Sequence, residues 1–149
     1  MATIHRQENT DQIENLKHIF EAFSQLDLPV ILPMHPRTRK YMNEISNKSN
    51  VIIIDPVGYL EMITLLNNCH KVLTDSGGLQ KEAFFLKKPC ITLREETEWI
   101  ETLEGNWNYV TGTDPVKILE KIRNNHFEEQ LQYFGDGKAA EKIVEYLLK

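Results

Sequence analysis

The sequence predicts an α/β protein with a three-layer, doubly wound parallel sheet of the Rossmann-like class. Short apolar runs typical of strands alternate with longer segments in which apolar residues recur at helical spacing. The run VIII at Val51–Ile54 is β-branched or aliphatic throughout, as expected of a strand that is buried on both faces. Because alternating strands and helices form parallel sheets with helices on both faces, we expect that architecture here.

In the first half of the chain, each predicted strand ends at a polar loop and a helix follows the loop. The first long helix has apolar residues at the i, i+3, i+4, i+7 spacing, and Thr10 or Asp11 is expected to cap it. The second strand ends in a loop with two prolines, which cannot continue a central strand. In order, we expect a strand over 2–4, a helix over 11–26, a strand over 30–32, a helix over 37–45, a strand over 51–54 and a helix over 59–68.

The second half continues the alternation. A strand over 72–74, a polar corner and a helix over 79–86 form one parallel unit, and Pro115 is tolerated in the first turn of a later helix. The other expected elements are a strand over 89–93, a charged loop over 94–99 leading into a short helix, a strand over 107–110, a helix over 115–123, a turn over 134–137 and a terminal helix over 139–148.

Composition limits the class of protein. The 149 residues fit one domain, and the net charge of -5 disfavours a nucleic acid held by general phosphate attraction. No apolar run approaches the roughly 18 residues that would suggest a membrane span. Cys69 and Cys90 lie in apolar surroundings that suit the reduced thiols of a cytoplasmic protein, and no zinc-ligand spacing occurs. We expect no metal or cofactor and, because the chain begins within a strand, a longer parent protein.

The segment KVLTDSGGLQKEA carries the strongest functional signal. Ser76, Gly77 and Gly78 stand between a strand and a helix, where free N–H groups and the helix dipole attract phosphate. The two glycines let an anion approach the backbone without meeting a Cβ. Glu82, one turn further, is placed to accept hydrogen bonds from a ribose. The alternative is an ordinary helix start capped by Asp75 or Ser76, with glycines that serve only the turn.

Polar residues also follow the other strands, and the carboxyl ends of parallel strands share one edge, where ligands bind. Arg6 and Arg94 either contact phosphates or pair with neighbouring glutamates such as Glu8, Glu95, Glu96 and Glu98. His5 is either an acid–base residue or an exposed loop histidine, and His35 is either a ligand or a turn residue. The predicted site edge comprises His5, Arg6, Glu8, Asn9, His35, Arg37, Asp55, Asp75, Ser76, Gly77, Gly78, Arg94, Glu95 and Glu96.

Five motifs occur in order: HRQEN at 5–9, PMHPR at 33–37, IDPVGYLEM at 54–62, LTDSGGLQKEA at 73–83 and LREETEW at 93–99. Together they resemble the C-terminal domain of the non-hydrolysing UDP-N-acetylglucosamine 2-epimerases, nearly from end to end. The segment GNWNYVTG at 105–112 resembles the branch that includes epimerases of modified UDP-acetamido sugars. The resemblance therefore identifies a family and leaves the sugar open.

The resemblance implies the two-domain GT-B fold, with residues 1–149 as the UDP-binding C-terminal domain and the N-terminal domain absent. It implies that His5 is catalytic, that Ser76, Gly77 and Gly78 bind the phosphates of UDP or a UDP-N-acetyl sugar, and that Glu82 binds the ribose. Arg94 would line the same cleft, and Tyr59, beside it, is a candidate for contact with uracil.

In such a family the reaction inverts C2 by eliminating UDP to a glycal and adding it back, which serves the synthesis of cell-surface polysaccharide precursors. We expect a cytoplasmic homodimer for the full-length enzyme and, because most of the proton-transferring carboxylates belong to the absent domain, UDP binding without epimerisation for this chain. The alternatives are the donor domain of a GT-B glycosyltransferase and a non-catalytic nucleotide-sugar binding module.

Overall fold

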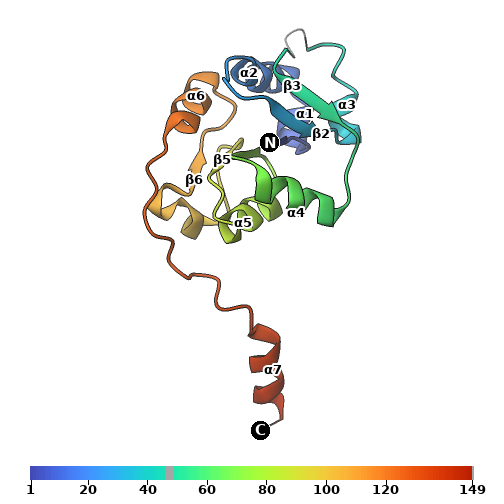
Figure 1. The fold of residues 1–149 in the computed structure, drawn as a ribbon. Coiled ribbons are helices and arrows are strands. Elements are labelled where there is room, and N and C mark those ends of the chain that lie inside the picture. Colours follow the sequence, from blue (N-terminus) through green and yellow to red (C-terminus); the bar gives the residue numbers. More distant parts are fainter. Residues whose placement is uncertain (46–48, 149) are drawn as a thin grey trace.

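The computed structural model describes residues 1–45 and 49–148, in which strands and helices alternate along the chain (Figure 1). The strands are β1 (Ala2–Thr3), β2 (Val30–Pro33), β3 (Val51–Ile54), β4 (Val72–Thr74), β5 (Cys90–Thr92) and β6 (Asn108–Val110). The helices are α1 (Gln7–Thr10), α2 (Ile13–Ser24), α3 (Pro36–Arg39), α4 (Tyr59–Asn68), α5 (Gly77–Phe85), α6 (Pro115–Arg123) and α7 (Ala139–Leu147), and a 3₁₀ helix, η1, covers Ile100–Asn106.

The strand pairings are parallel and confirm the predicted fold class. β1, β4, β5 and β6 pair in that order, and β2 pairs with β3. Because β2 also lies beside β1, the strand order across the molecule is β3-β2-β1-β4-β5-β6. The chain therefore winds away from β1 in both directions, and the point between β1 and β4 is the switch point at which doubly wound folds bind ligands.

Two apolar cores cover the two faces of the sheet, which gives the three predicted layers. One core contains Phe20 of α2 and Ile118 of α6, and the other contains Leu66 of α4. Within β4, Leu73 enters the first core and Val72 the second, because successive side chains of a strand point to opposite faces. Both faces of the central strands are thus buried, and their polar groups can be reached only at the strand ends.

The start of the first long helix differs from the prediction. The residues before it form the short helix α1, and α2 begins at Ile13 after Gln12 at the N-cap position. Thr10 is fully buried and its hydroxyl donates to the carbonyl of Arg6. The proposed cap was wrong because α1 already uses that hydroxyl.

Two further predictions are corrected by the structure. The helix expected over 37–45 ends at Arg39, because the chain then forms tighter turns in which Tyr41 N–H donates to Thr38 O. β3 is not buried on both faces: Ile52 and Ile53 are 50% and 42% exposed, since β3 lies at the edge and pairs with β2. Its β-branched residues therefore reflect strand preference rather than burial.

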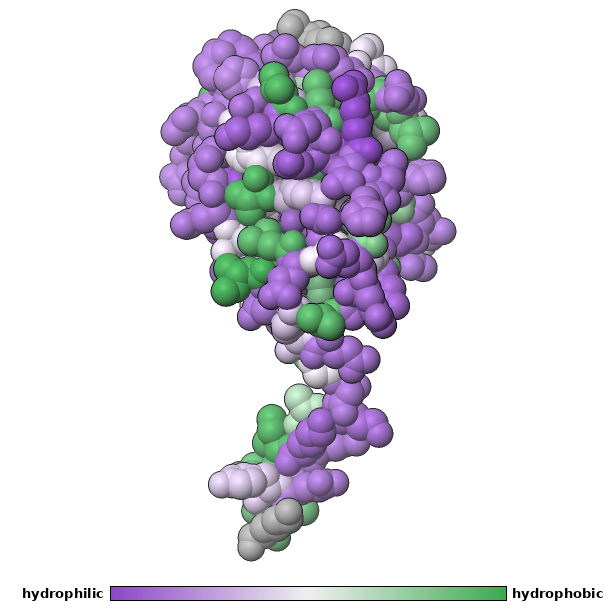
Figure 2. Space-filling model, turned by 90° about the vertical axis from the view of Figure 1, so that its left-hand side faces the viewer, coloured by the Kyte–Doolittle hydropathy of each residue, from purple (hydrophilic) through white to green (hydrophobic). Residues whose placement is uncertain are grey.

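The C-terminal helix α7 stands away from the sheet at the end of an extended segment (Figure 1). Its apolar side is uncovered, with Ile143 58% and Leu147 75% exposed, and Figure 2 shows hydrophobic side chains open at the foot of the molecule. In the described part of the chain, none of the helices has the length and apolar character needed to cross a membrane.

Candidate functional site

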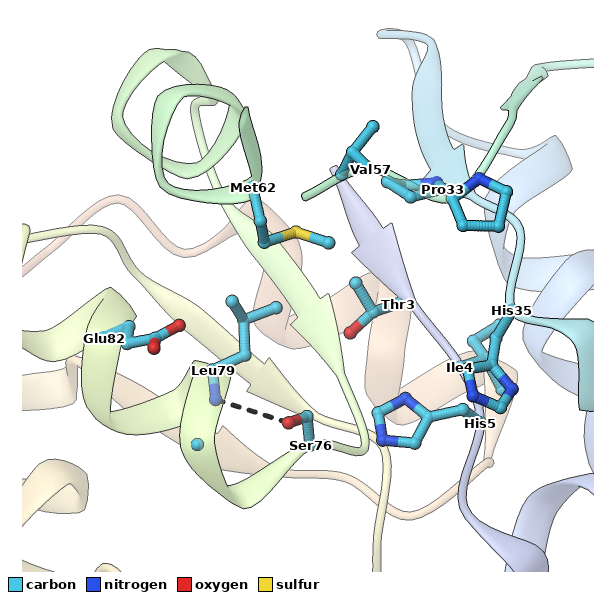
Figure 3. Close-up of a pocket in the computed structure, with 12 residues that line it drawn as sticks. Thr3, Ile4, His5, Pro33, His35, Val57, Met62, Ser76, Leu79 and Glu82 are labelled. Carbon is cyan, nitrogen blue, oxygen red and sulfur yellow. Dashed lines mark hydrogen bonds between the residues drawn. The ribbon is translucent and has the colours of Figure 1, made fainter. Parts of the chain in front are cut away.

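A pocket of about 310 Å³ opens at the switch point, beside the carboxyl ends of β1, β2 and β4. Figure 3 shows His5 and His35 on one side of it and Glu82 on the other, with Met62 of α4 above. It is lined by Thr3, Ile4, His5, Pro33, His35, Pro56, Val57, Met62, Ser76, Gly78, Leu79 and Glu82. An apolar wall with a few polar groups is typical of a small-molecule site.

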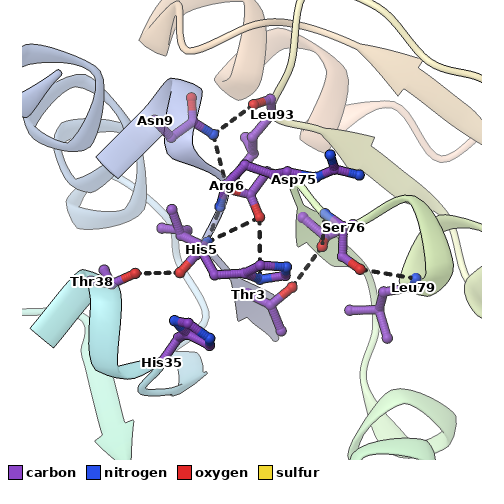
Figure 4. A network of polar contacts seen from close by, with 12 residues as sticks. Thr3, His5, Arg6, Asn9, His35, Thr38, Asp75, Ser76, Leu79 and Leu93 are labelled. Atoms are coloured by element: carbon purple, nitrogen blue, oxygen red, sulfur yellow. Dashed lines mark hydrogen bonds and ion pairs between the residues drawn. The ribbon is translucent and has the colours of Figure 1, made fainter. Parts of the chain in front are cut away.

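Asp75, directly after β4, connects the strand ends beside this pocket. Its carboxylate is fully buried and accepts hydrogen bonds from His5 N at 3.0 Å, Arg6 N at 2.9 Å and Asn9 Nδ2 at 3.1 Å (Figure 4). Asn9 Nδ2 also donates to the carbonyl of Leu93 at 2.9 Å, beyond the end of β5. One carboxylate thus holds the loop after β1 against the end of β4, and the shape of the pocket depends on it.

His5 is half-buried at the pocket wall, with Nδ1 3.5 Å from Oδ1 of Asp75 and its ring 5.2 Å from the ring of His35. Burial lowers the pKa of His5, and Asp75 opposes this by raising it, while His35, Arg6 and Arg37 lower it further. The imidazole is therefore neutral at neutral pH and can donate from one nitrogen and accept at the other.

The start of α5 has two backbone donors without partners. Ser76 N–H donates to Thr74 Oγ1 at 3.0 Å, and Ser76 Oγ accepts from Leu79 N–H at 3.4 Å. Within the described ranges, no residue accepts a hydrogen bond from the N–H of Gly77 or Gly78. These two donors and the positive end of the α5 dipole form an anion-binding corner.

The two glycines of this corner differ. Gly78 is exposed and lines the pocket, and a Cβ there would meet nothing closer than Ser76 Oγ at 3.9 Å. Gly77 is buried and does not line the pocket, and a Cβ there would lie 2.1 Å from Oε1 of Glu98. The space predicted for an approaching anion is therefore open at Gly78 and filled at Gly77.

A charged cluster lies beside Gly77. Arg94 Nη1 is 2.7 Å from Oε2 of Glu98 and Arg94 Nε is 3.8 Å from Oε2 of Glu8, while Arg6 Nη2 is 3.8 Å from Oε1 of Glu98. Without ligand, the arginines therefore pair with glutamates, which is one of the two alternatives read from the sequence. The pKa of Glu98 is lowered, first by its own backbone N–H and then by Arg94.

The remaining predicted residues lie around the pocket rather than in it. Arg37 is exposed, and its backbone N–H donates to Nδ1 of His35 at 3.2 Å. Tyr59 is 66% exposed at the start of α4, and Asp55 pairs with Arg39 at 3.1 Å. The structure thus brings together five of the predicted residues in one pocket: His5, His35, Ser76, Gly78 and Glu82.

The sequence interpretation considered Asp75 as a helix cap and as one of the polar residues at the site edge, but it missed the hydrogen bonds by which Asp75 holds the loop after β1. Ser76 takes the cap position instead. An acidic residue directly after a short strand that contains no charged residue was the available signal, because a carboxylate buried there needs several donors. Elsewhere, residues 1–45 and 49–148 contain no group of three or more His, Cys, Asp or Glu side chains that could hold a metal ion.

The model of the UDP-N-acetylglucosamine 2-epimerase family matches residues 1–148. The chain belongs to this family. It is 52% identical to a UDP-N-acetylglucosamine 2-epimerase homolog of Methanococcus maripaludis, across 99% of this chain and 43% of that protein. It is 46% identical to the UDP-2,3-diacetamido-2,3-dideoxy-D-glucuronate 2-epimerase of Pseudomonas aeruginosa, across 100% of this chain and 44% of that protein. The chain thus spans less than half the length of these relatives.

Solved epimerase structures agree with the fold. The UDP-GlcNAc 2-epimerase of Methanocaldococcus jannaschii is 39% identical and superposes with a TM-score of 0.87, across 99% of this chain and 44% of that chain. A structure of the enzyme from the same organism in complex with UDP-GlcNAc and UDP has a TM-score of 0.82 over the same shares. The resemblance of the five motifs to this family is therefore confirmed.

Proposed function

We propose that this chain is the UDP-binding part of a UDP-acetamido-sugar 2-epimerase. The observation that carries the proposal is the switch-point pocket, in which the free N–H of Gly78, the hydroxyl of Ser76 and the carboxylate of Glu82 line one opening. The complex of the Methanocaldococcus enzyme with UDP-GlcNAc and UDP supports it.

In this proposal the diphosphate binds at the start of α5. The N–H groups of Gly77 and Gly78 and the hydroxyl of Ser76 donate to phosphate oxygens, and Arg94 and Arg6 supply positive charge. Glu82 accepts hydrogen bonds from the ribose: it lines the pocket, and its carboxylate makes no hydrogen bond or ion pair with another residue of the described chain. Tyr59 and His35 are left to contact the base or the sugar.

The whole enzyme would invert C2 of the sugar by eliminating UDP and adding it back. Donors aimed at the diphosphate stabilise the negative charge that develops when the C–O bond to UDP breaks, and they retain UDP for the return step. In this proposal His5, which is neutral and lies next to Asp75, accepts a proton or donates a hydrogen bond beside the diphosphate.

The rest of the catalytic site would come from the part of the protein that relatives have and this chain lacks, which we propose to be an N-terminal domain. Both a UDP-N-acetylglucosamine 2-epimerase and a UDP-2,3-diacetamido-2,3-dideoxy-D-glucuronate 2-epimerase occur among the relatives, so the substituents of the sugar are left open. The homodimer and the cytoplasmic location stay predictions.

Titration calorimetry on the 149-residue protein tests the proposal. UDP should bind at least about tenfold more tightly than uridine, because only UDP reaches the anion corner. Glu82→Ala should weaken both ligands by about the same factor, since both carry the ribose. Glu21→Ala, on the exposed side of α2, is the matched control and should change neither. Equal affinities for UDP and uridine would show that the diphosphate does not bind at the start of α5.

A second experiment tests the reaction. The missing part is supplied by joining this chain to the N-terminal half of the Methanococcus relative, and UDP-N-acetylglucosamine in deuterium oxide is followed by proton NMR. Loss of the C2 proton signal with formation of the 2-epimer is expected. A fused protein that binds UDP but exchanges no C2 proton would contradict the epimerase assignment.

A further inference from the structure

Glu98 occupies the approach to Gly77 at the start of α5. A Cβ on Gly77 would lie 2.1 Å from Oε1 and 3.1 Å from Cδ of Glu98, so this carboxylate rests directly on the glycine. The neighbouring Trp99 donates from Nε1 to Gly77 O at 2.8 Å, which fixes the loop against the helix. The carboxylate is therefore held where the sequence predicted the anion of a ligand.

The two arginines that could bind a phosphate both contact Glu98. Arg94 is 2.7 Å from it and Arg6 is 3.8 Å from it. The side chain of Arg94 is only 9% exposed, and its buried Nε has no hydrogen-bond partner in the described chain, with the Glu8 carboxylate 3.8 Å away. Buried donors are nearly always paired, so Arg94 has capacity left for a further acceptor.

Charge makes Glu98 and a diphosphate exclude each other. The pKa of Glu98 lies below its usual value, through its own backbone N–H and then Arg94, so it is ionised at neutral pH. Glu98 and Glu8 offset the charges of Arg6 and Arg94 in the ligand-free protein. A diphosphate at Gly78 would meet a like charge one residue away, and that repulsion is substantial at a few ångströms.

We propose that Glu98 is an internal anion that competes with the diphosphate of the ligand for Arg94, Arg6 and the start of α5. The proposal rests on the proposed function, because it takes UDP as the ligand of this corner. When the diphosphate binds, the carboxylate turns away from Gly77 into solvent, which its 43% exposure allows, and the arginines turn to the phosphates. Glu98 is thus a specificity residue: a ligand without phosphate gains nothing by displacing it.

The test is titration calorimetry of UDP and uridine with the 149-residue protein and two variants. Glu98→Gln keeps the shape and removes the charge. Glu96→Gln removes the same charge from an exposed residue of the same loop and is the matched control. We expect Glu98→Gln to bind UDP about three- to tenfold more tightly and uridine unchanged. Glu96→Gln should change UDP affinity by less than about twofold.

Each result bears on the proposal. Unchanged or weaker UDP binding by Glu98→Gln would overturn it, since Glu98 would then only position Arg94 or brace the loop. Equal gains for UDP and uridine would also overturn it, because the effect would not pass through the phosphates. UDP binding by Glu98→Gln but not by the unmodified protein would support it. If neither protein binds UDP, the proposed function fails and this inference fails with it.

Discussion

Two carboxylates flank the start of α5, and they are held in opposite ways. Asp75 ends β4, is fully buried and accepts hydrogen bonds from two backbone N–H groups and one side-chain amide. Glu98 comes from the loop after β5, is 43% exposed and forms ion pairs with the side chains of two arginines. The difference separates a carboxylate that fixes the pocket from one that is free to leave it when a ligand arrives.

Asp75→Ala should have the largest effect on stability. It leaves the N–H groups of His5 and Arg6 without their acceptor at a buried site and removes one of the two acceptors of Asn9 Nδ2. Each unpaired buried donor costs about 1–3 kcal/mol, so we expect the free energy of unfolding to fall by about 3–5 kcal/mol in urea denaturation.

The control for this variant is Asp55→Ala. Asp55 also follows a strand end, but its side chain is 94% exposed and pairs only with Arg39. An exposed pair contributes about 0–1 kcal/mol, so this variant should stay within that range of the unmodified protein. A loss of under about 1 kcal/mol for Asp75→Ala would show that the buried bonds do not hold the loop.

The contacts of these two carboxylates could not be predicted from the sequence, although the fold and much of the site could. Strand–helix alternation and the polar residues after each strand were local signals, and they located the fold, the edge and Ser76, Gly78, Glu82 and His5. The donors to Asp75 lie 66 to 70 residues away in the chain, so no local pattern identifies them. Glu98 covers Gly77 because the loop after β5 folds back over α5, which depends on tertiary packing.

The exposure of β3 and the early end of α3 escaped prediction for a related reason. A β-branched run is the same in an edge strand as in a central strand, and only the strand order puts β3 at the edge. Sequence patterns thus predicted which elements exist, whereas the burial of individual residues followed from their neighbours across the sheet.

The stability of the protein should also depend on pH through His5, which lies next to the buried carboxylate of Asp75. Burial lowers the pKa of His5 from its ordinary 6.5, against the opposing effect of Asp75. The unfolded chain therefore binds the proton more readily than the folded protein. The contribution of neutral His5 is complete above about pH 6.5 and is lost as the pH falls through the lowered folded value.

Urea denaturation at about pH 7.5 and about pH 5.5 measures this effect. The unmodified protein should be less stable at the lower pH, by less than the loss caused by Asp75→Ala, and His5→Asn should reduce the difference. His18→Asn, on the exposed side of α2, is the control and should retain it. If His5→Asn showed the same difference in stability between the two pH values as the unmodified protein, groups other than His5 would be responsible for it.

Glu98→Gln should have only a small effect on stability, although it is expected to strengthen UDP binding about three- to tenfold. The carboxylate of Glu98 that pairs with Arg94 and Arg6 is partly exposed to solvent. Such ion pairs contribute less than about 1 kcal/mol to the free energy of unfolding. The free energy of unfolding, measured in urea, should therefore change by less than that amount. A loss comparable to that of Asp75→Ala would place Glu98 among the residues that hold the fold, and a carboxylate bound so firmly could not give way to a diphosphate.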